Sequence, residues 1–397
     1  MKNWIFSIAL GWCSLVTAQV PLVQQTANQV SLDSMVTTVK QLTGLLPIEG
    51  TTILNSRFKG TVGNTLTSNF IQRKLAGYGV AFDTVNFGGT GTNIIAKIPG
   101  RRTDRVILIG GHFDAVGGSN LEFFYPGADD NASGTAAVLE AARVCANQQF
   151  PISLHFAFWD EEEQGLVGSQ ASVYDYLQGN TLVAYINLDM IAWSMNNDSV
   201  VEIHTRPSGN SVELANRIVE IISRYQIPLN PVVMNPGDPN TDHGTFWANN
   251  LTAVGINEIY NGPKMNPNWH RLTDSLSTFN LPYFHQMAKL ATTAFLDLAM
   301  DSFGLVGVSE ESRLAQAVLA YPNPANTELS LQLSPNLHLI DVNMYNQLGD
   351  EVNLMREDDQ LQLPVSLANG LYWLSISVKQ NGSNEVFTVR KKIAIQH

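Results

Sequence analysis

Strand-like apolar runs alternate with helical stretches over roughly the first 300 residues of this 397-residue chain. Residues 152–158 alternate as a strand does, and residues 133–145, rich in Ala, Val and Leu, predict a buried helix. Further strands are expected at 105–110 and 183–188, and a long helix at 282–298. Such alternation predicts an α/β domain whose mixed, largely parallel central sheet is flanked by helices. In such sheets, functional side chains lie at the carboxyl ends of the strands.

The chain changes character after about residue 300. Residues 304–317 read as a linker, and only short alternating runs follow, at 329–333, 337–344, 371–378 and 387–395. Short alternating strands without helices predict a small all-β sandwich. We therefore expect one domain over residues 19–303, the linker at 304–317, and a second domain over 318–397.

Acidic and imidazole side chains follow several of the predicted strands. They are His112-Phe113-Asp114, Asp129-Asp130 before a helix, Asp160 to Glu163, Asp189, and Asp242-His243. Taken singly, each has a structural explanation: an Asp can cap a helix, and a run of acids can lie in a solvated turn. Carboxylates gathered at one edge of a sheet, however, repel one another unless a cation is present. Imidazoles with carboxylates are a zinc-type ligand set, so the pattern predicts a metal site.

The tandem Glu162-Glu163 suggests what such a site would do. A carboxylate shared by two metals ~3.5–4 Å apart can hold a water between them and lower the pKa of that water. The reaction then still needs a general base, which an acid next to a ligand supplies. One of the two glutamates would hold metal and the other would take the proton.

The acidic segments resemble the bizinc aminopeptidases of the leucyl-aminopeptidase-like family, which also includes enzymes related to plasma glutamate carboxypeptidase. The motifs that carry the resemblance span residues 105–275, and the zinc-exopeptidase-like fold would cover about residues 30–300. Carried over position by position, the resemblance implies two zinc ions per chain. His112 and Asp189 would hold one zinc, Glu163 and His243 the other, and Asp129 would bridge both.

The same resemblance assigns the catalytic residues. Glu162 would be the general base, and Asp114 would orient His112 from behind, as carboxylates commonly do for metal-bound histidines. The family's cis peptide bond would fall between Asp129 and Asp130. Residues 269–276 loosely resemble a His-Thr-x-x-Asp-Thr stretch near the family's pocket, and the role of His270 stays open.

The implied function is that of a secreted zinc metalloprotease, an aminopeptidase that hydrolyses amino-terminal residues from peptides through a metal-bridged water. One alternative is a glutaminyl-peptide cyclotransferase on the same fold, with one zinc held by Asp129, Glu163 and His243. The retained Asp129-Asp130-Asn131 favours two metals and peptidase chemistry. A carboxypeptidase or dipeptidase of the same family stays open. A binding protein that keeps only the fold is disfavoured, because every expected ligand is present.

An apolar pocket for the substrate side chain is also expected. The aromatic loop Phe123-Phe124-Tyr125 lies between two predicted ligands and should overhang the site. The side chains that could line the pocket with it are Met190, Trp193, Phe246, Trp247 and Tyr260.

Both ends of the chain read as delivery signals. Residues 1–18 have a positive start, an uncharged apolar run and a small-residue cleavage site, as signal peptides do. That run is shorter than the ~18 apolar residues that span a bilayer, so we expect no membrane-spanning segment. The motifs Tyr321-Pro322-Asn323-Pro324-Ala325, Gly370-Leu371-Tyr372 and Lys391-Lys392-Ile393 resemble C-terminal sorting domains of the type IX secretion system. The resemblance implies a secreted or cell-surface protein with the secretion machinery as partner; an adhesive or carbohydrate-binding sandwich is the alternative.

Charge and cysteine content exclude other classes of function. The chain carries 23 Lys and Arg against 35 Asp and Glu, a net charge of −12, which makes nucleic acid a poor partner. Of the two cysteines, Cys13 lies in the predicted signal and Cys145 remains, so cysteine-based zinc sites and CxxC redox pairs are excluded. The sequence also lacks the Gly-x-Ser-x-Gly motif of serine hydrolases and the HExxH motif of other zinc proteases.

Overall fold

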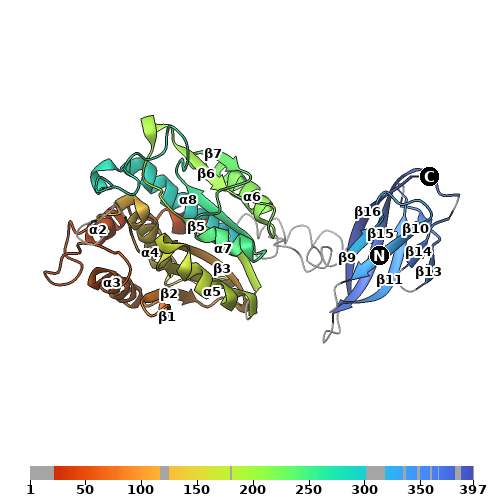
Figure 1. Ribbon diagram of the computed structural model, residues 1–397, viewed down its shortest axis with the longest axis horizontal. Helices are drawn as coiled ribbons and strands as arrows, with labels where there is room; N and C mark the ends of the chain where they lie inside the picture. The colour runs from red at the N-terminus through yellow and green to blue at the C-terminus, as the bar shows by residue number, and fades with distance from the viewer. Residues whose placement is uncertain are drawn as a thin grey trace, which may run out of the picture. The chain divides into compact units, whose positions relative to one another are not determined.

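The computed structural model describes residues 22–116, 125–178, 181–300, 318–333, 337–346, 349–357, 360–364, 366–380 and 386–396. The predicted signal peptide and linker, together with Phe123 and Phe124, lie outside these described residues. The chain divides into two compact units, Met1–Gly307 and Val308–His397 (Figure 1). Among the described helices, none combines the length and apolar character needed to cross a bilayer.

The first unit is built from one sheet and the helices around it. Its helices are α2 (Leu32–Leu42), α3 (Val62–Tyr78), α4 (Gly134–Cys145), α5 (Val167–Gln178), α6 (Ser211–Arg224), α7 (Asp242–Ala248) and α8 (Leu281–Met300). Its strands are β1 (Ala81–Phe87), β2 (Gly91–Ile98), β3 (Arg102–His112), β4 (Ile152–Trp159), β5 (Thr181–Leu188), β6 (Val200–His204), β7 (Asn230–Met234) and β8 (Ala253–Asn257).

The eight strands form one mixed sheet in the order β1-β2-β4-β3-β5-β8-β6-β7. The four central strands, β4, β3, β5 and β8, run parallel, while β2 and β6 join them antiparallel. The predicted fold class, an α/β domain with a largely parallel central sheet, is therefore confirmed for this unit. Because parallel strands end at the same edge, the segments after β3, β4, β5 and β8 converge there.

Apolar side chains cover both faces of the central strands. In β3, Ile107 and Ile109 belong to the core beneath α2, α4 and α8, whereas Val106 and Leu108 face the aromatic cluster beneath α5 and α7. In β4 all eight residues are buried. A strand covered on both faces must be apolar almost throughout, so its ends are the first positions where acids can reach an open edge.

Caps explain where the helices begin and end. The side chains of Ser31 and Thr61 accept hydrogen bonds from the backbone N–H groups of Ser34 and Asn64, at the starts of α2 and α3. At the end of α3, Gly79 takes the left-handed conformation with φ 74°. These caps set the bounds of α3 at Val62 and Tyr78.

The second unit is all-β, as predicted. Its strands are β9 (Val318–Tyr321), β10 (Glu328–Leu333), β11 (Leu337–Tyr345), β12 (Glu351–Val352), β13 (Met355–Glu357), β14 (Gln360–Gln362), β15 (Gly370–Gln380) and β16 (Val386–Ile395). They form two four-stranded antiparallel sheets in the orders β13-β14-β10-β9 and β12-β11-β15-β16. Leu329 of one sheet and Leu374 of the other are buried in a single apolar core, as in a sandwich.

Candidate metal centre

Asp130 lies between two histidines, and each of its carboxylate oxygens faces one of them. Oδ1 is 3.3 Å from Nε2 of His112, and Oδ2 is 3.2 Å from Nε2 of His270. Each imidazole has a second acid beside the same nitrogen: Asp189 at 3.4 Å from His112, and Glu163 at 3.0 Å from His270. One carboxylate shared by two imidazole–carboxylate pairs is the donor arrangement that a pair of bridged metal ions requires.

The chemistry of these donors fits a metal. His112, Glu162 and Asp189 can bring one ligand atom each to within 4.8 Å of one another, and so can His112, Asp130 and Glu163. Nε2 of His112 is buried among these acids yet has no hydrogen-bond partner in the described structure. Buried polar atoms are nearly always satisfied, and a metal ion would satisfy this one. Nitrogen and carboxylate oxygen donors together are the zinc-type set.

Burial and mutual repulsion dominate the electrostatics of the site. Burial and the negative charge of Asp130 raise the pKa of Glu163 to about 8. Burial also raises the pKa of Glu162 well above its usual value, against the opposing charge of His112. For Asp130, burial alone would raise the pKa, but the adjacent imidazoles of His112 and His270 hold it below the usual value. A divalent cation would allow all these acids to ionise together.

Without zinc, we expect the protein to lose stability as pH rises from about 5 to about 8. The pKa of Glu163 is raised from 4.5 to about 8, so the folded state holds a proton that the unfolded chain has released. The stability linked to that proton is fully present below the unfolded pKa and is lost as pH rises through the folded one. His270, whose pKa is raised from 6.5 to about 10, acts in the same direction. Thermal denaturation with chelator or with zinc should show a zinc-induced rise in Tm that grows over this pH range; a rise that shrinks would contradict the expectation.

Asp114 connects His112 to the turn that carries Glu162 and Glu163. Its Oδ1 lies 3.3 Å from Nδ1 of His112, the ring nitrogen on the side away from Asp130. Its two oxygens also accept the backbone N–H groups of Glu162 and Glu163, at 3.1 and 3.3 Å. A single buried carboxylate at the end of β3 thus orients an imidazole and fixes the turn after β4 that carries both glutamates.

The acidic run after β4 splits into two pairs that face different ways. Asp160 accepts hydrogen bonds from Asn64 and from the backbone of Thr92, at 2.8 and 3.0 Å. Glu161 accepts one from the Thr90 hydroxyl and pairs with Lys59 at 3.3 Å. These two acids therefore support the turn, while Glu162 and Glu163 face the site.

The side chains that contact one another at the site form what we call the acid cluster: His112, Asp130, Glu162, Glu163, Asp189 and His270. Asp129, predicted as the bridging ligand, lies outside it. Its Oδ1 accepts the backbone N–H groups of Ile191 and Ala192, at 3.1 and 3.0 Å, and its Oδ2 accepts the Asn266 amide at 2.9 Å. Oδ1 thus holds the turn that follows Asp189, and Oδ2 holds Asn266 in the segment between β8 and α8. The cis peptide bond also lies one residue later than predicted, between Asp130 and Asn131. The carboxylate that lies between the two histidines is therefore that of Asp130, not that of Asp129.

His243, predicted as the second imidazole ligand, is also outside the cluster. It is fully buried in α7 with its ring 4.4 Å from the Trp247 ring. Nε2 donates to the carbonyl of Asp238 at 2.9 Å, so Nδ1 is the acceptor for the Thr241 hydroxyl at 2.6 Å. Burial lowers the pKa of His243 to about 3. Both ring nitrogens of His243 are thus engaged by the protein, and the imidazole that lies beside Asp130 and Glu163 is that of His270.

His270 lies in the long segment between β8 and α8, and Asp274 ties that segment to the site. The carboxylate of Asp274 accepts the backbone N–H groups of Asp129 and Asp130, at 2.9 and 3.1 Å. The ring of Trp269 stacks on His270 with centroids 4.1 Å apart. The loose match of residues 269–276 to a family motif is the sequence signal for this histidine, and Asp274 of the same stretch binds the turn that carries Asp130.

Arg57 is a supporting residue that no sequence motif indicates. Its guanidinium is fully buried and donates to the backbone carbonyls of Phe113, Pro126 and Gly127, at 2.7 to 2.8 Å, and to that of Leu42. It thereby clamps the segment after β3 to the turn that carries Asp130. A lone arginine in a loop gives no signal of such a role.

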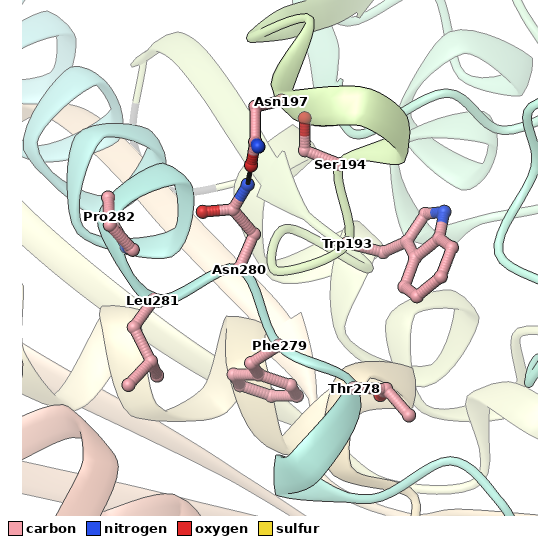
Figure 2. Close-up of a pocket in the computed structure, with 8 residues that line it drawn as sticks. All are labelled: Trp193, Ser194, Asn197, Thr278, Phe279, Asn280, Leu281 and Pro282. Atoms are coloured by element: carbon pink, nitrogen blue, oxygen red, sulfur yellow. Dashed lines mark hydrogen bonds between the residues drawn. The ribbon is translucent and has the colours of Figure 1, made fainter.

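The aromatic residues predicted to line a pocket have different places. Phe246 and Trp247 pack in the core beneath α5 and α7. Trp193 borders a cavity of about 530 Å³. Figure 2 shows Asn197 and Asn280 facing each other there, joined by a 2.6 Å hydrogen bond, while the Trp193 indole points away from this pair. The other lining residues are Ser194, Thr278, Phe279, Leu281 and Pro282. No residue of the acid cluster lines this cavity, so we assign it no role in the chemistry.

Comparison with known protein families divides the chain in the same way. Residues 93–295, about half of the chain, match the model of peptidase family M28. Residues 319–396 match a secretion system C-terminal sorting domain. The first match contains the whole acid cluster, and the second contains the strands of the all-β unit from residue 319 onward.

Individual relatives give the same picture at lower coverage. Leucine aminopeptidase 1 of Arthroderma gypseum is 30% identical over 221 residues, which is 52% of this chain and 58% of that protein. The LapA aminopeptidase of Legionella pneumophila has a similar structure, with TM-score 0.61 and 23% identity over 70% of this chain and 74% of that one. A glutaminyl cyclase of Porphyromonas gingivalis is also similar, with TM-score 0.55 and 19% identity over 67% of this chain and 98% of that one. The fold is thus common to aminopeptidases and cyclases, and only the site can distinguish them.

Proposed function

The chain belongs to peptidase family M28, and on that premise we propose that it is a zinc-dependent aminopeptidase that hydrolyses amino-terminal residues from peptides. The observation that carries the proposal is Asp130, shared between the His112–Asp189 pair and the His270–Glu163 pair. A site with one zinc has no need for two complete imidazole–carboxylate pairs around one acid. The shared acid therefore favours two zinc ions per chain and peptidase chemistry over cyclase chemistry.

The residues that would hold the metals follow from this arrangement. His112 and Asp189 would hold one zinc, His270 and Glu163 the other, and Asp130 would bridge both. When bound, two zinc ions supply Lewis acidity and lower the pKa of a water molecule at the site. Asp114 would keep the His112 ring in the orientation that this requires.

Glu162 would be the general base. Its carboxylate lies 3.9 Å from Nε2 of His112, farther than either oxygen that we assign to a metal on that side. It is buried, and burial raises the pKa of its carboxyl group, which brings its proton affinity closer to that of the groups it must exchange protons with. Its place on a turn pinned by Asp114 would let it accept a proton from water and pass it to the leaving amine.

The C-terminal unit indicates that the protein is exported. Its match to a sorting domain implies a secreted or cell-surface protein that uses the secretion machinery. The substrates would then be extracellular peptides, and residues 1–18 would act as the signal peptide that starts export.

A mixed peptide pool tests the proposed function. The purified full chain, loaded with zinc, should remove amino-terminal residues one after another from peptides with free amino termini, as followed by mass spectrometry. Chelator should abolish the reaction, and peptides with blocked amino termini should stay intact as the internal control. Loss of ammonia from glutamine-leading peptides alone would instead mean a cyclase, and loss of residues from the other end would mean a carboxypeptidase.

A further inference from the structure

The turn after β5 begins with Asp189, one of the proposed zinc ligands, and its backbone is held by residues from other segments. The carbonyl of Asp189 accepts a hydrogen bond from the Asn257 amide at 2.6 Å. Met190, the next residue, has a φ of 55°, a left-handed conformation that residues other than glycine rarely adopt. Such a conformation persists only where the surrounding structure fixes it. The direction of the Asp189 side chain therefore depends on the residues that hold this turn.

Glu258 holds the turn at two points. It directly follows β8, which pairs with β5 in parallel, so the ends of the two strands lie side by side. The backbone N–H of Glu258 donates to the carbonyl of Met190 at 2.9 Å. Its side-chain Oε2 accepts the backbone N–H of Trp193. One residue thus holds both ends of the turn around Met190, while Asp129 accepts the two N–H groups in between.

The environment of Glu258 suits an acceptor for the backbone. The residue is fully buried in the structure. Burial, followed by the negative charge of Asp129, raises the pKa of the Glu258 carboxyl group well above its usual value, so the group stays neutral. A neutral carboxyl can accept the Trp193 N–H without burying a further charge beside a site already rich in acids. Neither the metal ligands nor the base, as assigned above, accounts for this residue.

We propose that Glu258 is a positioning residue, which fixes the turn after β5 and so keeps the carboxylate of Asp189 beside Nε2 of His112, where one zinc would bind. The inference rests on the proposed zinc site and deepens it. Oδ1 of Asp189 lies 3.4 Å from that nitrogen. Residues that hold a metal ligand from behind set its orientation, and their loss weakens metal binding even though they do not touch the metal.

Glu258→Ala tests the inference because it removes the acceptor of the Trp193 N–H. In calorimetric zinc titrations, one of the two binding steps should weaken about 10- to 100-fold, the usual effect of losing such a residue. In a His270→Ala chain, the remaining zinc should weaken by the same factor, which identifies it as the one beside His112. In zinc-free protein, hydrogen exchange of the Trp193 amide should accelerate, since that N–H has lost its partner.

Two further substitutions at this position separate a positioning role from simple loss of stability. Glu258→Gln should restore zinc affinity and slow exchange, because the amide oxygen can accept the same N–H and the side chain is neutral like the buried acid. Glu258→Asp keeps a carboxyl group but shortens the side chain by one methylene, so it should weaken the same zinc while removing less volume than alanine does.

Glu140→Ala is the matched control. Glu140 is also a buried acid that holds backbone, but its carboxylate accepts the N–H of Ser31 and the hydroxyl of Ser34 at the start of α2. Its loss should lower stability and leave zinc affinity intact. The inference is overturned if Glu258→Ala and Glu258→Asp bind zinc as tightly as the wild type, or if Glu140→Ala weakens zinc equally. A wild-type chain that binds two zinc ions but releases no amino-terminal residues would refute the proposed function instead, because these measurements use no substrate.

Discussion

Replacing Glu162 with glutamine should lower kcat by about 10²- to 10⁴-fold, the range for loss of a general base, while both zinc ions stay bound. Glutamine has nearly the same volume but cannot accept the proton. The backbone N–H at this position is held by Asp114, so the replacement should stay in place. Turnover of an amino-terminal peptide substrate and zinc content by elemental mass spectrometry measure the two halves of this expectation.

Glu161→Gln provides the control for that experiment. Glu161 precedes the base directly, but its carboxylate contacts Thr90 and Lys59 rather than the site. Its replacement should change kcat only a few-fold, because an amide oxygen can still accept the Thr90 hydrogen bond. Full activity in Glu162→Gln would refute the assignment of the base, and loss of zinc from that variant would make Glu162 a ligand instead.

The fold could be predicted from the sequence because burial on two faces leaves a strong pattern. Residues of β3 that face α4 and residues that face α5 both have to be apolar, so the strand reads as a continuous apolar run. The helices between strands show the 3.6-residue period of a surface that packs on one side. These patterns are local, and the parallel edge where the acids gather follows from them directly.

The kinds of residue at the site were predictable, but not always which residue. Asp129 and Asp130 are neighbours in sequence, yet one faces the metal-site imidazoles and the other faces the backbone after β5. The two side chains point in different directions because of the turn before α4, which the Asp274 carboxylate, 144 residues away in sequence, holds by a hydrogen bond. No local pattern of side chains reports a backbone direction that is set by so distant a contact.

Which of the two histidines lies beside the acids was not predictable from the sequence, for a related reason. His243 directly follows an aspartate in the way that ligands often do, but the first turns of α7 lead its ring into the core against Trp247. His270 lies in a long segment without regular structure, where spacing says little about which way the chain folds back. Its position depends on the Asp274 hydrogen bonds across the sheet edge, a tertiary contact rather than a sequence pattern.

Replacing His270 with alanine should therefore remove one of two zinc ions and nearly all hydrolysis, whereas His243→Ala should remove neither. Nε2 of His270 lies within contact of both Asp130 and Glu163. Even residues that only hydrogen-bond to a metal ligand commonly contribute about 10- to 100-fold to metal affinity. Loss of the ligand itself should exceed that, with kcat down by at least about 10³-fold, as for other essential members of a catalytic set. His243→Ala should instead destabilise the fold by about 2–4 kcal/mol, since it leaves a cavity and unpaired polar groups in the core.

Zinc titration monitored by calorimetry, together with denaturant unfolding of both variants, separates the two histidines. The expected result is one zinc with near-normal stability for the first variant, and two zinc ions with reduced stability for the second. The reverse result would restore His243 as the ligand and require α7 to turn its ring out of the core when metal binds. That rearrangement would break the hydrogen bonds of His243 to Thr241 and Asp238, so unfolding energies measured with and without zinc would expose it.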